Sequence, residues 1–296
     1  MKLPKNKAWL LAYFLLFITA TVLCLRLVHE PDLWWQLRTG EYILENKTVP
    51  DVDVFSYTYE GKPWLNVKWG FEVIQATVVK WFGPEFLPLP QIFANILLLV
   101  TIIFLYRQFP FSKNLSRIAK FAVLLLLLVG LSYRMNGRPE LTTYLFTAIY
   151  VLIFTGHSYG RERWIFALIP LQMLWANLHE AYGVGMVMMG IYLLGAWYEY
   201  FLAKPKSALL KAKRNKTTLV IIAAFLVVMI HPSGERMLFH PYEIFTQLSE
   251  NQFTAEIFSA ANKAYWQMPA FVSMLFLAIG GISLISFQMQ KGQSRI

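Results

Sequence analysis

Residues 29–69 read HEPDLWWQLRTGEYILENKTVPDVDVFSYTYEGKPWLNVKW and gather acidic and aromatic side chains directly after the first apolar run of the chain. That run covers residues 8–28 and reaches the length of about 20 apolar residues that a helix needs to cross a bilayer. Because no small-residue cleavage site follows it, we expect a retained span rather than a signal peptide. The quoted stretch is then expected to be a long loop on the far side of a membrane.

The composition agrees with a membrane protein. The 296 residues are 57% hydrophobic and only 15% charged, whereas soluble domains carry about 25% charged residues. Further spans are predicted near 86–106, 117–133, 141–156, 164–177, 182–201, 217–231 and 270–288. Residues 70–82 contain Glu72 and Lys80 and are too short to span. We therefore expect a single all-α polytopic domain over 1–296 with about eight transmembrane helices.

The distribution of charge predicts the orientation. If residues 70–82 do not cross, 17 of the 27 Lys and Arg residues lie in the segments 1–7, 107–120, 157–163, 202–216 and 289–296. Because cytoplasmic loops are enriched in Lys and Arg, these segments and both termini are expected to be cytoplasmic. The net charge of +10 then faces anionic lipid, and no nucleic-acid partner is expected.

Two helices are expected within the first outer loop, residues 29–85. A helix near 32–46 starts at Asp32 after a proline and presents one apolar face, which is typical of a helix lying on the bilayer. A second interfacial helix is expected near 67–82. Between them, the alternation from residue 50 to 64, with Gly61 and Pro63, predicts a short extended hairpin or an ordered loop.

This arrangement resembles the GT-C superfamily of membrane glycosyltransferases, in which an acidic residue follows the first span and two helices of a long first loop lie along the membrane. More narrowly, five stretches are similar to motifs of a bacterial GT-C-like family: DLWWQLRTGEYI (32–43), PDVDVFSYTYEGKPW (50–64), RPE (138–140), WANLHE (175–180) and HPSGERMLFHP (231–241). The chain departs from that family's motifs at two positions. Glu180 replaces the glycine of W-x-N-x-H-G, and His231 replaces the asparagine of N-P-x-G. The similarity covers nearly the whole chain, which is short for a GT-C enzyme.

The resemblance implies a reaction and its catalytic residues. GT-C enzymes transfer a sugar from a polyprenyl-phosphate donor at the outer, periplasmic face of the bacterial inner membrane. Such a transfer needs a carboxylate that takes the proton of the acceptor. The family's acid at the start of the first loop matches Asp32, with Glu30 as the second candidate. The residues alone offer another role, because Asp32 can also cap the helix that it begins.

The same loop supplies candidates for substrate binding. Asp51 and Asp53 are expected to orient an acceptor or to bind a divalent cation through oxygen ligands, and a turn-stabilising role is the alternative. Trp34 and Trp35 are candidates for stacking on a sugar ring. Tryptophans at this depth also form the aromatic belt of membrane proteins, which is their alternative role.

The later outer segments supply the remaining candidates. Arg134 and Arg138 are expected to clamp the lipid phosphate, because guanidinium groups bind phosphate bidentately; the alternative is an ion pair with Glu140. His179 and Glu180 are expected to be an acid–base or metal-binding pair, and the alternative is a structural hydrogen-bonded pair.

Asn177 completes the candidate substrate-binding residues, and the ligands expected are membrane lipid and a lipid-linked sugar donor. The histidines show no recognised spacing of zinc ligands, so no metal residues are assigned. A divalent cation is the one cofactor that the acidic loop suggests.

Two other functions stay open from the sequence. The short chain and the altered WANLHE and HPSG motifs are compatible with a non-catalytic subunit that assembles with membrane protein partners. A transporter of a lipid-linked intermediate would place charges within spans and repeat symmetry along the chain. Since Asn95 is the main polar residue deep in a span, the transporter comes last.

Overall fold

The computed structural model describes residues 5–25, 32–108, 116–132, 138–203, 207–250, 268 and 271–279. These residues form helices, turns and loops, and no strand occurs among them. The α-helices are α1 (Lys5–Cys24), α2 (Asp32–Asn46), α3 (Trp69–Phe82), α4 (Leu89–Gln108), α5 (Arg117–Leu131), α6 (Glu140–Ser158), α7 (Leu168–Leu178), α8 (Tyr182–Leu202), α9 (Ala208–Leu226) and α10 (Arg236–Glu250). Short 3-10 helices are η1 (Pro84–Phe86), η4 (Glu162–Ala167) and η5 (Val227–Met229), and residues 271–279 are also helical.

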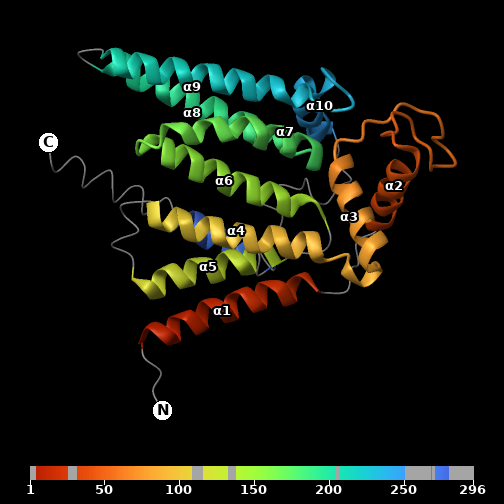
Figure 1. Ribbon diagram of the computed structural model, residues 1–296, viewed down its shortest axis with the longest axis horizontal. Helices are drawn as coiled ribbons and strands as arrows, with labels where there is room; N and C mark the ends of the chain where they lie inside the picture. The colour runs from red at the N-terminus through yellow and green to blue at the C-terminus, as the bar shows by residue number, and fades with distance from the viewer. Residues whose placement is uncertain are drawn as a thin grey trace.

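The helices form two groups (Figure 1). Helices α1 and α4 to α9 run lengthwise beside one another, whereas α2 and α3 stand across one end of this bundle. Within the bundle α4 packs against α1 and α6, and α9 packs against α7 and α8. We call the end covered by α2 and α3 the capped end. The opposite end, where α6 and α8 finish and the lysine-rich first half of α9 begins, is called the basic end.

Among the described residues, three helical segments are long and apolar enough to cross a membrane: Lys7–Cys24, Pro84–Tyr106 and Glu140–Ser158. They coincide with three of the predicted spans, and they indicate association with a membrane. The other bundle helices fall short by length or polarity, as α7 does with 11 residues. Three of the about eight predicted spans thus have a candidate in the structure, and the others stay a prediction. Of the last predicted span, only 271–279 belongs to the described residues.

The outside of the bundle is apolar. Large aliphatic side chains such as Leu10 on α1, Leu194 on α8 and Leu219 on α9 are exposed. Monomeric soluble proteins rarely expose extensive apolar patches. This surface therefore agrees with a lipid environment around the lengthwise helices.

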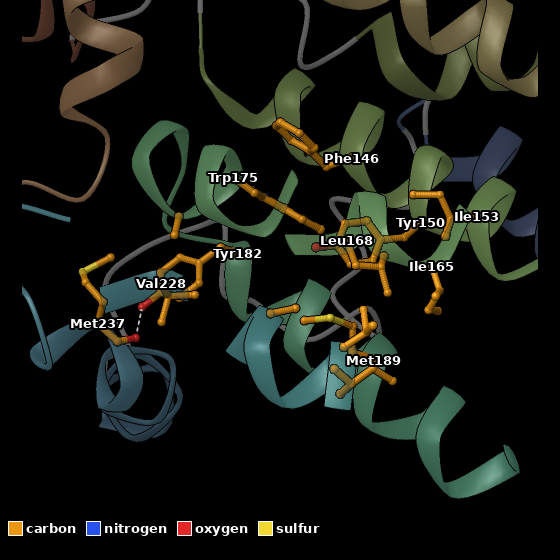
Figure 2. Close-up of a cluster of buried hydrophobic side chains, with 14 of the residues drawn as sticks. Phe146, Tyr150, Ile153, Ile165, Leu168, Trp175, Tyr182, Met189, Val228 and Met237 are labelled. Carbon is orange, nitrogen blue, oxygen red and sulfur yellow. Dashed lines mark hydrogen bonds between the residues drawn. The ribbon is translucent and has the colours of Figure 1, made fainter. Parts of the chain in front are cut away.

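One of the two apolar cores is centred on Trp175 of α7 (Figure 2). Its ring stacks on Phe146 at a centroid distance of 5.4 Å and meets Tyr150 edge to face, also at 5.4 Å. The Tyr150 hydroxyl donates a hydrogen bond of 2.6 Å to Gln172 Oε1. Gln172 Nε2 in turn donates to the carbonyl of Tyr182, so the polar atoms inside this core are paired across α6, α7 and α8.

The second core joins α1, α4, α5 and α6. Leu99, Leu124 and Leu128 are almost completely buried there. Asn95, the polar residue deep in α4, donates a hydrogen bond of 3.1 Å to the carbonyl of Ala20 on α1. This amide ties two helices together, which is the usual role of an isolated polar side chain between transmembrane helices.

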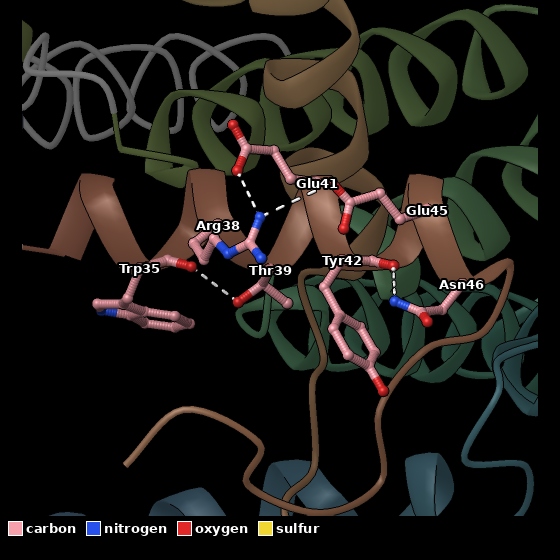
Figure 3. A network of polar contacts seen from close by, with 7 residues as sticks. All are labelled: Trp35, Arg38, Thr39, Glu41, Tyr42, Glu45 and Asn46. Carbon is pink, nitrogen blue, oxygen red and sulfur yellow. Dashed lines mark hydrogen bonds and ion pairs between the residues drawn. The ribbon is translucent and has the colours of Figure 1, made fainter. Parts of the chain in front are cut away.

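The two interfacial helices predicted in the first loop are confirmed as helices, with α3 starting at Trp69 rather than at 67. They pack closely because α2 has a glycine at the contact. A Cβ atom at Gly40 would lie 2.1 Å from the carbonyl oxygen of Glu72 and 2.8 Å from the Cβ of Ala76. The exposed face of α2 is polar instead, where Arg38 pairs with Glu41 at 3.0 Å (Figure 3).

The hairpin predicted after residue 50 is confirmed as an ordered hairpin loop. Val52 and Pro63 form an isolated antiparallel bridge. Beside it, the Asp53 amide donates to Lys62 and the Trp64 amide donates to Asp51, each at 2.8 Å. The loop leaves α2 and returns to the start of α3, so it closes one side of the capped end.

Replacing Gly40 tests the contact between α2 and α3. We expect Gly40→Ala to destabilise the protein by about 1–3 kcal/mol, because the added methyl group meets backbone that cannot move aside. Gly190→Ala on α8 is the control, since a Cβ there meets nothing within 4 Å. Thermal unfolding in detergent measures both; equal melting temperatures for the two variants would contradict the close contact.

Candidate functional site

A cleft of about 1070 Å³ lies at the capped end. It lies between the end of α2, the two arms of the hairpin, the start of α3 and the turn that precedes α10. Its lining residues are Ile43, Leu44, Lys47, Thr48, Val49, Pro50, Asp51, Trp64, Leu65, Trp69, Val73, Pro232, Ser233, Gly234, Glu235 and Arg236. The cleft thus combines the first outer loop with the HPSGER stretch, which lies far away in the sequence.

The cleft carries charges of both signs. Lys47 and Arg236 contribute cations, and Asp51 and Glu235 contribute carboxylates. Within the described part of the chain, neither of these two carboxylates makes a hydrogen bond or an ion pair. They are therefore available to a ligand that carries hydroxyl groups or a cation.

A second, apolar cavity of about 400 Å³ adjoins the cleft. It lies between α3 and α7, is lined mainly by residues such as Ile74, Met173 and Leu174, and shares Trp69 and Val73 with the cleft. A charged cavity and an apolar cavity therefore meet along one side of α3. This arrangement fits a ligand with a polar head and an apolar chain.

Asn177 holds α3 against the bundle. Its Oδ1 accepts a hydrogen bond of 2.7 Å from Trp69 Nε1, and its Nδ2 donates to the carbonyls of Met173 and Ile230. A Cβ atom at Gly70 would lie 2.7 Å from the Asn177 carbonyl oxygen, so the two backbones touch here. The side chain was predicted to bind substrate; in the structure it lines the apolar cavity with its amide groups already engaged.

The predicted catalytic Asp32 starts α2 and accepts a hydrogen bond of 3.1 Å from Trp35 Nε1. The Lys68 ammonium lies 4.5 Å from the centre of the same Trp35 ring. Asp32 does not belong to the lining of the cleft. Trp34 is exposed, and Glu30 lies outside the described residues. The catalytic role of Asp32 stays a prediction.

Asp53 stabilises a turn. Its Oδ1 accepts hydrogen bonds from the amides of Phe55 and Ser56, and its Oδ2 accepts one of 2.6 Å from the Ser56 hydroxyl. These bonds lower the pKa of Asp53, the Ser56 side chain having the largest effect. With Trp35 and Trp64 it lines a smaller cavity of about 360 Å³. The turn-stabilising alternative therefore describes Asp53, whereas Asp51 faces the main cleft.

His179 and Glu180 have different environments. His179 is buried, and its Nδ1 lies 2.7 Å from the Thr143 hydroxyl and accepts a hydrogen bond from the Ala181 amide. Burial, together with the charge of Lys68, lowers the pKa of His179 to about 3, so the ring is neutral. Glu180 is exposed. The structure therefore does not bring the two side chains together as an acid–base pair.

Arg138 pairs with Glu140 at 3.3 Å, which is the alternative considered for it, and Arg134 lies outside the described residues. No group of three His, Cys, Asp or Glu side chains that could hold a metal ion occurs among the described residues. Asp51 remains the predicted oxygen ligand that reaches the cleft.

Glu72 was not among the predicted site residues. It lies on α3 and is completely buried where α3 packs against α2. Asn66 Nδ2 donates a hydrogen bond of 2.6 Å to its Oε2. Burial raises the pKa of Glu72 to about 7, although the bond from Asn66 and the charge of Lys68 oppose this. An acid within the apolar segment GFEVIQA was visible in the sequence, but its burial depends on the packing of α2 over α3.

Comparison of the chain with protein-family models, with curated proteins and with solved structures found no match. The GT-C resemblance therefore stays a prediction from the sequence motifs.

Glu72→Gln tests the buried carboxyl. The folded protein keeps a proton that the unfolded chain loses above its ordinary pKa of 4.5. The neutral Glu72 carboxyl therefore makes its full contribution to the stability of the folded protein below pH 4.5, and this contribution is lost as the pH rises through about 7. We expect Glu72→Gln to raise stability near pH 8 by up to about 3 kcal/mol and to have little effect near pH 5.

Glu41→Gln on the exposed face of α2 is the matched control, and melting curves in detergent across this pH range are the measurement. A Glu72→Gln variant that is destabilised equally at every pH would show that the carboxylate is ionised and specifically bound instead.

Proposed function

We propose that the protein is a polytopic membrane glycosyltransferase of the GT-C type that uses a lipid-linked sugar at its capped end. The observation that carries this proposal is the pair of adjoining cavities, one charged and one apolar, that share Trp69 and Val73. A polyprenyl-phosphate sugar has the same division into a polar head and an apolar chain. Ligand sites with convergent polar groups in a concave, partly apolar setting are the usual starting point for such an assignment.

We propose about eight spans in a bacterial inner membrane, of which three candidates occur among the described helices. Helices α1 and α4 to α9 lie lengthwise, and α2 and α3 cross their end as interfacial helices would. The basic residues Lys211, Lys213, Arg214 and Lys216 gather at the opposite end of the bundle. In the proposed orientation the basic end is cytoplasmic, with both termini, and the capped end is periplasmic.

The cleft offers groups for each part of the reaction. Trp64 and Trp69 provide aromatic surface for the sugar, and Lys47 and Arg236 provide positive charge for the phosphate. The acceptor hydroxyl attacks the anomeric carbon, the bond from that carbon to the phosphate oxygen breaks, and polyprenyl phosphate leaves. The acceptor proton passes to a carboxylate. We assign this role to Asp51, a candidate substrate-binding residue that lines the cleft.

A second candidate function is a non-catalytic GT-C-like subunit of a larger membrane complex. The specific observation in its favour is that Asp32, the residue matching the family's acid, is bonded to Trp35 and does not line the cleft. In that case the cleft would still bind lipid, but no carboxylate would be needed.

Binding of polyprenyl phosphate tests the cleft itself. We expect Arg236→Gln to weaken binding about tenfold, because a charge-assisted hydrogen bond to phosphate contributes about 1.5–3 kcal/mol. Arg38→Gln is the matched control, since Arg38 lies on the exposed face of α2. Native mass spectrometry of the detergent-purified protein measures both variants, and equal affinities would exclude Arg236 as a phosphate ligand.

The choice between the two carboxylates is tested by turnover. In liposomes that contain bacterial polyprenyl-phosphate sugars, we expect Asp51→Asn to reduce sugar release by at least about a hundredfold while lipid binding persists. Asp32→Asn should retain activity if its role is confined to the start of α2. Loss of activity in Asp32→Asn alone would restore the family's assignment, and a wild-type protein that binds lipid without turnover would support the non-catalytic subunit.

A further inference from the structure

A separate pocket lies at the basic end, between the end of α6 and one face each of α8 and α9. Its volume is about 430 Å³. On α9 it is lined by Leu210, Lys213, Arg214 and Thr217, whose spacing places them on one side of a helix. The ends of α6 and α8 and the start of α9, which line this pocket, lie at the end of the bundle opposite α2 and α3 (Figure 1).

Two buried polar side chains in its wall are incompletely bonded. His157 and Thr217 are each only 1% exposed, and both line the pocket. His157 Nε2 and Thr217 Oγ1 have no hydrogen-bond partner within the described residues. Buried polar atoms without partners are costly, and both residues line the pocket, so a small side-chain rotation that turns these atoms toward a bound ligand would complete their bonding.

The charged side chains that line the pocket form no ion pair with one another in the described part of the chain. Lys213 and Arg214 contribute positive charge, and the Arg214 guanidinium is fixed between the rings of Trp197 and Tyr200 at 4.3 and 4.0 Å. Glu199 lines the same pocket, and in the described part of the chain its carboxylate has no hydrogen-bond or ion-pair partner. The pocket thus presents sites for an anion and for a cation at once.

We propose that this pocket binds the phosphoethanolamine head group of a membrane phospholipid. The phosphate lies against Lys213, His157 Nε2 and Thr217 Oγ1, and the ammonium pairs with Glu199. A phosphate oxygen at Nε2 selects the tautomer with its proton on Nε2, in which Tyr192 donates to His157 Nδ1 at 2.6 Å. Ser158 then donates to the Tyr192 oxygen at 3.1 Å, so every polar hydrogen in this series of hydrogen bonds has an acceptor.

The surroundings favour a lipid over a soluble phosphate. Ile191 lines the pocket and is also exposed on the outside of α8, close to the exposed Leu194 and Tyr198. The pocket therefore borders the apolar surface along which acyl chains would lie. Its position at the basic end corresponds to the depth of lipid head groups if the lengthwise helices span the membrane, as proposed above.

Gly195 allows the pocket to be filled directly. A Cβ atom at Gly195 meets nothing within 4 Å, and the residue lines the pocket. Native mass spectrometry with added phosphatidylethanolamine should show affinity reduced about tenfold in Gly195→Val. Gly190→Val is the matched control, because Gly190 is on the same helix and equally open but does not line the pocket. Equal affinities in the two variants would overturn the proposal.

Charge substitutions provide an independent test if Gly195→Val does not fold. We expect Lys213→Gln to weaken phosphatidylethanolamine and phosphatidylglycerol alike by about tenfold. Glu199→Gln should weaken only phosphatidylethanolamine, so that the preference between the two lipids is reversed or lost. Lipid binding that is unchanged in both variants would overturn the proposal.

Arg38→Gln, on the exposed face of α2, should bind phosphatidylethanolamine as the wild-type protein does. The source of the head group is tested by competition. Soluble phosphoethanolamine or inorganic phosphate that displaces the lipid at equal concentration would assign the pocket to a soluble ligand and reject the lipid.

Discussion

The hydrogen bond from Trp69 Nε1 to Asn177 Oδ1 joins the α2–α3 layer to the bundle, and the arrangement of the capped end depends on it. Trp69 belongs to the walls of both cavities, so its position defines where the charged cleft ends and the apolar cavity begins. Gly70 permits this junction, because any side chain would collide with the Asn177 carbonyl. Asn177 also reaches Ile230, which fixes the turn on the other wall of the cleft.

Local patterns in the sequence were sufficient for the elements of the first loop but not for their roles. The start of α2 at Asp32 and the hairpin with Gly61 follow from short-range preferences, and both are present. The use of a side chain depends on distant partners. The bonds from Asn177 to Trp69 and Ile230 could not be read from the sequence, because both partners lie far from Asn177 along the chain. Lys47 lines the cleft and follows the end of α2 with a positive φ of 58°.

The two departures from the GT-C-like motifs have physical explanations. His231 Nδ1 accepts a hydrogen bond of 3.0 Å from the Ser233 amide, which is the bond that an asparagine side chain makes two residues ahead of it in a turn. Burial lowers the pKa of His231 to about 4, so the ring stays neutral and able to accept. Glu180 is exposed and is not among the residues with positive φ, so its position does not require glycine.

The boundary between the two cavities also limits where chemistry can occur. If the two cavities bind a polyprenyl-phosphate sugar, as proposed, the phosphate that joins its apolar chain to the sugar would lie where the cavities meet, beside Trp69 and Val73. The sugar then extends into the cleft toward the hairpin, where Asp51 and Trp64 line the wall. A carboxylate can take the acceptor proton only from within hydrogen-bond reach. With this docking, Asp51 meets that geometric condition more directly than Asp32, whose carboxylate is bonded to Trp35 outside the cleft.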